Sequence, residues 1–288
     1  MDEVLPEPLG RPDPEPFGER ADLRRAQQAG GDGVGRAHAS IIRDRTPSAR
    51  AGQTADVLRL RWLTLLTGDP EGLDDRITRD LGLSRCTFDP ELEGFGVSSA
   101  VHPLGPDRFL EVCAPVREGT SAARRLAKAG DGVYMVIFQV GGLADHRRRL
   151  AEHGIRVVAE FDRPQTRGRW ASLHLHPADT GAALLSLDVS EPPEDFTVVE
   201  GPWREHVRTE VVTDLAGLEV HGSDPAALAE RWSAATGAAL RDGTLLLDDA
   251  RIAFREGSEG AATVLLDARE DRDLDLGGVR FVLRRPAP

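Results

Sequence analysis

The stretch of sequence that decides the fold runs from residue 132 to residue 162 and reads GVYMVIFQVGGLADHRRRLAEHGIRVVAEFD. Its first part, residues 132–140, is dominated by β-branched and aromatic residues and predicts a strand. Residues 143–154 predict a helix that stops at Gly154, and residues 155–162 predict the next strand. Two more strands are expected, at residues 169–176 and 183–189. The order of this unit is therefore β-α-β-β-β.

The same order of elements is predicted earlier in the chain, from residue 57 onward. A strand over residues 57–66 is followed by a helix over residues 69–82. That helix has Asp69 as its N-cap, Pro70 in its first turn and Gly82 at its end. Three strands follow it, at residues 84–88, 95–104 and 108–115. A linker helix over residues 121–130 separates the two copies.

A weaker third copy is predicted toward the end of the chain. Its helix, residues 224–237, begins with the same Asp-Pro pair, here Asp224 and Pro225. Short strands are expected around it, at residues 218–224, 243–249, 251–256, 262–270 and 278–285. The chain is thus expected to pair modules 57–116 and 130–190 in one domain over residues 57–190, followed by a third, degenerate module over residues 207–288.

Composition limits the functions that such a chain can have. The 288 residues carry a formal net charge of −12, which argues against nucleic acid and anionic membranes as partners. No apolar stretch reaches the length of a membrane span. The two cysteines, Cys86 and Cys113, cannot form a disulfide framework, so a reducing cytoplasm is expected. Residues 1–54, rich in proline, glycine and acidic side chains, predict a disordered tail.

One strand raises a functional question, because RFLEVCAP, residues 108–115, carries an acid at the centre of an otherwise buried pattern. Alternation places Phe109, Glu111 and Cys113 on one face of this strand. A carboxylate without a partner is costly in a core, so Glu111 is expected to line a site, with plain core packing as the alternative.

Three stretches resemble the vicinal oxygen chelate superfamily, and its glyoxalase-like branch in particular: GVSSAVHPLGPDRFLEV, GDGVYMVIFQVGGL and GIRVVAEFD with SLHLHPADTGAALLSLD. The superfamily includes glyoxalases, extradiol dioxygenases, and fosfomycin- and bleomycin-resistance proteins. The resemblance implies an α+β fold in which repeated βαβββ modules form an open, curved mixed sheet around a small-molecule cleft. It is also compatible with a homodimer.

The resemblance further implies a divalent metal in that cleft, held by His, Glu or Gln from the first and last strands of each module. Glu111 stands at one such position. The other three hold Trp62, Met135 and Ser186, which do not normally bind hard or borderline metals. The usual metal site is therefore expected to be largely lost.

A displaced metal site is one alternative for this chain. His174 and His176 alternate onto one strand face, with Asp179 just beyond, and they could bind a divalent metal together with Glu111. The other interpretation gives both histidines structural roles, as a packed or hydrogen-bonded rim residue and a turn residue before Pro177.

Alternation through the matching strands predicts the lining of the cleft. The face shared with Glu111 carries apolar side chains and a few polar ones, as small-molecule pockets do. The predicted ligand-binding residues are Trp62, Thr64, Phe109, Met135, Gln139, Ser186 and Asp188, and Ile137 shares their face.

Two functions remain open at this stage. The first is an enzyme of the lyase, isomerase or dioxygenase type that acts on a small carbonyl compound, with Glu111 as catalytic base or metal ligand. The second is a metal-independent protein that binds or sequesters an antibiotic-like small molecule between Trp62 and Met135.

Overall fold

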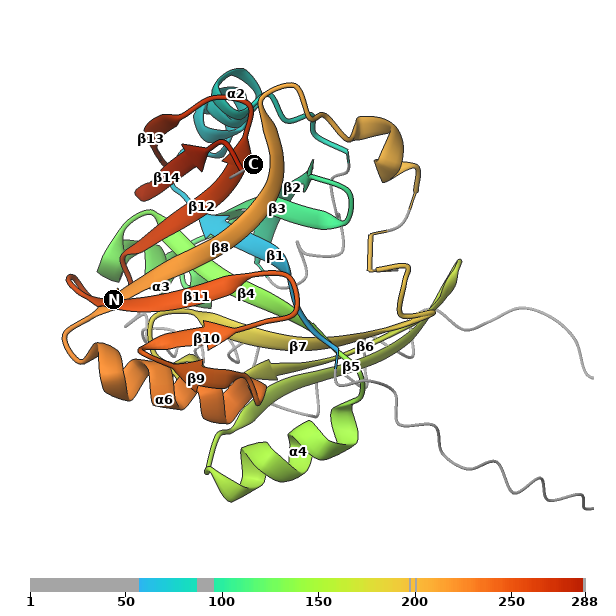
Figure 1. Cartoon of the computed structure of the whole chain (residues 1–288), viewed down its shortest axis with the longest axis vertical. Coiled ribbons are helices and arrows are strands. Elements are labelled where there is room, and N and C mark those ends of the chain that lie inside the picture. The colour runs from blue at the N-terminus through green and yellow to red at the C-terminus, as the bar shows by residue number, and fades with distance from the viewer. Residues whose placement is uncertain (1–56, 87–95, 197, 200, 287–288) are drawn as a thin grey trace, which may run out of the picture.

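The computed structural model describes residues 57–86, 96–196, 198–199 and 201–286 (Figure 1). The predicted tail, residues 1–54, lies outside the described residues. Two seven-stranded sheets make up most of the described chain. The first sheet has the strand order β2-β3-β1-β4-β7-β6-β5.

The first sheet comes from one continuous length of chain and alternates with four helices. Its strands are β1 (Leu58–Leu66), β2 (Val97–Leu104), β3 (Arg108–Pro115), β4 (Gly132–Val140), β5 (Val157–Gln165), β6 (Gly168–Leu175) and β7 (Leu184–Glu191). The helices are α2 (Pro70–Leu81), α3 (Ser121–Ala129), α4 (Leu143–Glu152) and the short α5 (Pro177–Thr180). The two predicted modules are therefore joined in one sheet.

The modules meet at the centre of this sheet, where β1 pairs antiparallel with β4. On its other side β1 pairs parallel with β3, and in the same way β4 pairs parallel with β7. The result is an open, curled, mixed sheet, which confirms the predicted fold class.

The second sheet repeats this arrangement with the rest of the chain. Its order is β13-β14-β12-β8-β11-β10-β9, with β8 and β12 antiparallel at the centre and a parallel neighbour beside each. Its elements are β8 (Val212–Gly222), α6 (Pro225–Thr236), β9 (Ala239–Arg241), β10 (Thr244–Leu246), β11 (Arg251–Glu256), β12 (Ala262–Ala268), β13 (Arg272–Leu276) and β14 (Val279–Arg284). A 3-10 turn, η2 (Trp203–His206), lies between the sheets in sequence. The segment predicted as one further module thus supplies a full seven-stranded sheet, while the division into domains stays a prediction.

Local sequence signals explain the helix ends. The Asp69 side chain accepts a hydrogen bond from the Gly72 backbone N–H at 3.1 Å, and α2 ends at Gly82 in the left-handed conformation. Helix α6 repeats the device with Asp224 as its N-cap and Gly237 at its end. Both predicted Asp-Pro helix starts are confirmed.

The two sheets share one hydrophobic core. Leu63, Phe138 and Leu187 of the first sheet belong to the same buried cluster as Val264 and Phe281 of the second. In Figure 1 the orange and red strands of the second sheet lie across the strands of the first. Burial of this joint apolar face is the main stabilising contribution to the arrangement.

Trp232 on α6 links the sheets within that core. Its side chain is fully buried, with ring centroids 6.3 Å from Phe138 and 5.5 Å from Phe254. Its indole N–H donates to the backbone oxygen of Thr180 at 3.1 Å, so the polar atom is satisfied.

A buried arginine holds the sheets in register. Arg108 on β3 is only 5% exposed; its guanidinium forms ion pairs with Asp214 on β8 and, at 3.1 Å, with Asp249. Its Nε donates to the Leu60 carbonyl at 3.1 Å. The two terminal nitrogens of the guanidinium therefore pair with acids on β8 and in the β10–β11 connection, while its Nε is bonded to the first sheet.

Several elements differ from the sequence-based expectation. Residues 84–86 of the predicted strand 84–88 are not in a strand, although the Cys86 N–H donates to Val101 at 2.8 Å, and residues 87–88 lie outside the described residues. Strands β9 and β13 were not predicted, because β9 has only three residues and β13 is short and rich in charged residues. In the described part of the chain, no helix has both the length and the apolar character needed to cross a membrane.

Removing the buried arginine should loosen the contact between the sheets. We expect Arg108→Ala to lower the free energy of unfolding by about 3 kcal/mol, because Asp214 and Asp249 lose their cation and Leu60 its donor. Urea denaturation measures this value. Arg280→Ala is the control, since Arg280 pairs with Asp273 on the exposed surface and should cost less than about 1 kcal/mol. Equal effects of the two substitutions would contradict the prediction.

Candidate functional site

The predicted site residues gather on the face of the first sheet opposite the shared core, called the site face below. Strand register places Trp62 beside Phe109, and Thr64 between Glu111 and Met135. The same register places Ile137 beside Ser186, and Gln139 beside Asp188. Every residue predicted to bind a ligand therefore lies on one surface of one sheet.

Glu111 is the centre of the first half of the site face. Its side chain is 7% exposed, and Oε2 accepts hydrogen bonds from the Thr64 hydroxyl at 2.7 Å and the Trp62 indole N–H at 3.1 Å. No described Lys, Arg or His forms an ion pair with it. Burial raises the pKa of Glu111, and the hydrogen bonds from Thr64 and Trp62 oppose that shift.

Asp188 occupies the corresponding centre of the second half. It is 1% exposed; the Ser186 hydroxyl donates to one oxygen, and the Trp170 indole N–H donates to the other at 2.7 Å. Burial raises the pKa of Asp188 to about 7, against the smaller effects of Ser186 and Trp170. Each half of the face thus holds a buried carboxyl group bonded to one indole and one hydroxyl.

Gln139, by contrast, is fully engaged within the protein. Its amide oxygen accepts from Arg61 Nε at 2.7 Å, and its amide nitrogen donates to the Pro193 carbonyl at 2.6 Å. Arg61 also forms an ion pair with Asp107. This network attaches the chain after β7 to the sheet.

A connecting segment follows β7, and its described residues between 192 and 211 cover part of the site face. Phe196, Val199 and Trp203 are buried in the same cluster as Trp62 and Phe109. The ring centroid of Phe109 lies 4.9 Å from that of Trp203 and 6.3 Å from that of Phe196. Sequence reasoning missed this cover, although three large apolar residues within a proline-rich connection were a signal for it.

The histidines proposed as metal ligands do not come together with Glu111. His174 lies on the site face with its ring 5.0 Å from Phe161, and burial lowers its pKa to about 4, so it is neutral at pH 7. His176 Nδ1 accepts from the Ala178 N–H at 3.1 Å and caps α5. Asp179 is bound by Arg156 at 2.7 Å.

The side chains on this face do not fit a metal centre of the superfamily. Strands β1, β4 and β7 separate Glu111 on β3 from His174 on β6. Trp62, at a former ligand position, uses its N–H to bond Glu111. Among the described residues, no three His, Cys, Asp or Glu side chains lie together as a metal would require.

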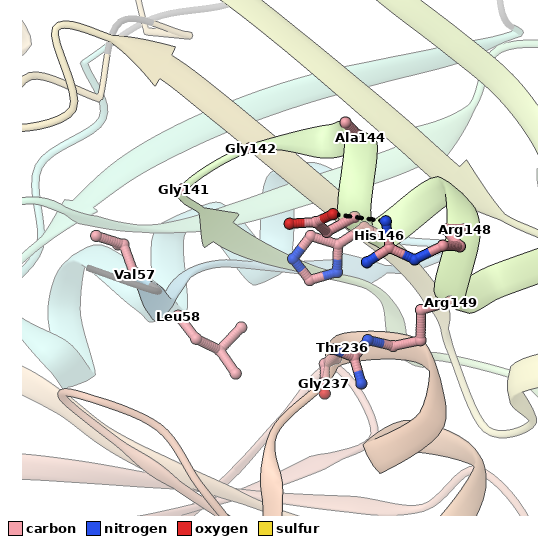
Figure 2. Close-up of a pocket in the computed structure, with 11 residues that line it drawn as sticks. Val57, Leu58, Gly141, Gly142, Ala144, His146, Arg148, Arg149, Thr236 and Gly237 are labelled. Atoms are coloured by element: carbon pink, nitrogen blue, oxygen red, sulfur yellow. Dashed lines mark ion pairs between the residues drawn. The ribbon is translucent and has the colours of Figure 1, made fainter. Parts of the chain in front are cut away.

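A separate cavity of about 280 Å³ lies at the start of α4, away from the site face (Figure 2). It is bordered by Leu58 of β1, by Gly237 after α6, and by His146 and Arg149 of α4. Arg148 on its rim pairs with Asp145 at 2.9 Å. None of the predicted site residues lines this cavity.

The curved sheet of two paired modules, with a site face on one side, defines a protein of the vicinal oxygen chelate superfamily. The chain belongs to the glyoxalase-like domain family, whose model matches residues 63–236, more than half of its length. No curated protein matches this sequence.

One solved structure shows the same fold at low sequence identity, and others match parts of the chain. A hypothetical protein from Staphylococcus aureus is 10% identical with a TM-score of 0.58, over 80% of this chain and 100% of that one. Methylmalonyl-CoA epimerase from Streptomyces coelicolor is 22% identical with a TM-score of 0.40, over 46% of this chain and 96% of its own. The epimerase from Mycobacterium tuberculosis is 24% identical with the same TM-score, over 46% and 87%. The likeness to the Staphylococcus aureus protein concerns the fold alone.

The raised pKa of Asp188 predicts a pH-dependent stability. Its folded pKa of about 7 lies above the unfolded value of about 4, so the folded state holds more protons between these values. Stability therefore falls as pH rises through this range. We expect Asp188→Asn to flatten the decline in the free energy of unfolding between about pH 5 and about pH 8. Urea denaturation at both pH values tests this, with the exposed Asp145→Asn as control; an unchanged slope in Asp188→Asn would contradict it.

Proposed function

We propose that this protein binds a small organic molecule on the site face without a metal ion. The observation that carries the proposal is Glu111, a buried carboxyl group held by Trp62 and Thr64 on a face walled by Phe109 and Met135. Apolar walls with few, well-placed polar groups are typical of small-molecule sites.

The residues on the site face have different roles in binding. Trp62, Phe109 and Met135 supply apolar contact, while Glu111 and Asp188 orient polar groups of the ligand. Gln139 contributes indirectly, because its bonds to Arg61 and Pro193 position the connecting segment. A ligand that reaches Glu111 displaces Phe196 and Trp203 from Phe109, so part of the binding energy offsets the loss of those contacts.

Proton transfer on a small carbonyl compound is the second candidate function. It is favoured by one observation, the absence of a described cation beside Glu111, which leaves burial to raise its pKa. A carboxylate in that environment is a stronger base than an exposed one and could accept a proton from a C–H next to a carbonyl. Isomerase chemistry of this kind needs a ligand carbon within reach of Glu111, a hydrogen-bond donor to the enolate oxygen, and return of the proton from Glu111 to carbon.

A ligand screen in the presence of a chelator tests the proposed function. We expect some members of a small-molecule library to raise the Tm of the full-length protein in EDTA, because binding to the folded state stabilises it. Glu111→Gln should weaken such a ligand by about tenfold, as expected for loss of a charged hydrogen-bond acceptor. Glu118→Gln is the matched control, since Glu118 is exposed and lies beyond β3.

Elemental analysis of the same samples can contradict the proposal of metal-independent binding. One equivalent of a transition metal, retained by Glu118→Gln and lost in Glu111→Gln, would overturn the metal-independent proposal. Exchange of a substrate C–H proton with solvent, abolished by Glu111→Gln, would instead support the second candidate.

A further inference from the structure

The second half of the site face carries a group of side chains that the proposed function does not yet explain. Trp170 and Ser172 on β6 flank Asp188 on β7, and Phe161 lies beyond them on β5. The rings of Phe161 and Trp170 are stacked, with centroids 5.5 Å apart and planes 20° apart. Trp170 is partly exposed, whereas Ser172 and Asp188 are buried beneath it.

Ser172 is the observation that points to a missing ligand. Its side chain is fully buried, and its hydroxyl has no hydrogen-bond partner among the described residues. The strand register places it directly opposite Asp188 on one side and Phe161 on the other. Buried hydroxyl groups are nearly always bonded, so this one leaves room for a partner that water or a ligand can supply.

The charges around Asp188 indicate which kind of molecule that is. Charged or titratable side chains on the strands around Asp188 include Arg61, Glu111, Arg163, Arg169 and His174, and Arg169 pairs with Asp162 and Glu191. Arg61 is engaged by Gln139 and Asp107, and the Arg163 guanidinium lies over Phe161 at 5.3 Å. His174 is neutral, because burial lowers its pKa to about 4. No described cation therefore pairs with the Asp188 carboxylate.

We propose that Asp188, Ser172, Trp170 and Phe161 form a subsite for a small organic cation, such as a protonated amine. The Asp188 carboxylate pairs with the ammonium group, the Ser172 hydroxyl accepts one of its N–H groups, and the two rings attract its charge. This inference rests on the proposed function and names the class of ligand.

Three probes of similar shape and different charge test the inference on the full-length protein. Benzylamine is the cation, benzyl alcohol the neutral analogue and benzoate the anion, and calorimetric titration measures the affinity of each. We expect benzylamine to bind at least about tenfold more tightly than benzyl alcohol, and benzoate more weakly than either. Asp188→Asn should remove the preference for benzylamine. Asp145→Asn, which changes an acid beside the other cavity, should leave it intact.

A pH series on the unmodified protein gives the same answer if Asp188→Asn does not fold. Benzylamine stays protonated between about pH 5.5 and about pH 8, whereas Asp188, with its pKa of about 7, gains its charge across this interval. Affinity for benzylamine should therefore increase about tenfold with pH, while affinity for benzyl alcohol stays constant.

The possible failures are distinguishable. If benzyl alcohol or benzoate binds as tightly as benzylamine, and Ser172→Ala weakens that binding, the cation inference is wrong and the proposed small-molecule function stands. If none of the three probes binds, the cation inference is also overturned, and the ligand screen on Glu111→Gln decides the proposed function separately.

Discussion

The position of one buried cation determines how the rest of the molecule is assembled. Arg108 faces the second sheet, where it meets Asp214 and Asp249, while its neighbour on the strand, Phe109, faces the opposite side. Alternation then points Glu111 to that same opposite side. The strand that carries the candidate acid is therefore held by an ionic contact on its other face, which keeps the carboxyl group in place without touching it.

The site face keeps two buried acids by supplying hydrogen-bond donors from neighbouring side chains. Here Trp62 and Thr64 supply hydrogen-bond donors to Glu111, and Ser186 and Trp170 do the same for Asp188. Neutral donors satisfy the lone pairs but leave the charge uncompensated, so both carboxyl groups favour their protonated forms more than exposed acids do.

Sequence reasoning succeeded where the physical signal is local. The Asp-Pro starts of α2 and α6, and the alternation that brings Trp62, Glu111 and Asp188 to one face, follow from caps and from the two-residue period of strands. It failed where the outcome depends on contacts between distant parts of the chain. The packing of Trp203 on Phe109 and the pairing of Ser172 with Asp188 depend on the path of the chain and on strand order, which no local pattern specifies.

The repetition of one strand order in two successive lengths of chain has a consequence for how the protein folds. Each sheet is completed by residues from its own continuous segment, so its hydrogen-bond ladders can close before the other sheet exists. The two hydrogen bonds between Leu58 and Asp248, 190 residues apart, join the two lengths of chain: the Leu58 N–H donates to the Asp248 carboxylate, and the Asp248 N–H donates to the Leu58 carbonyl. Docking of the sheets is thus the step of longest loop closure, and during synthesis the first sheet can emerge and fold while the second is still being made.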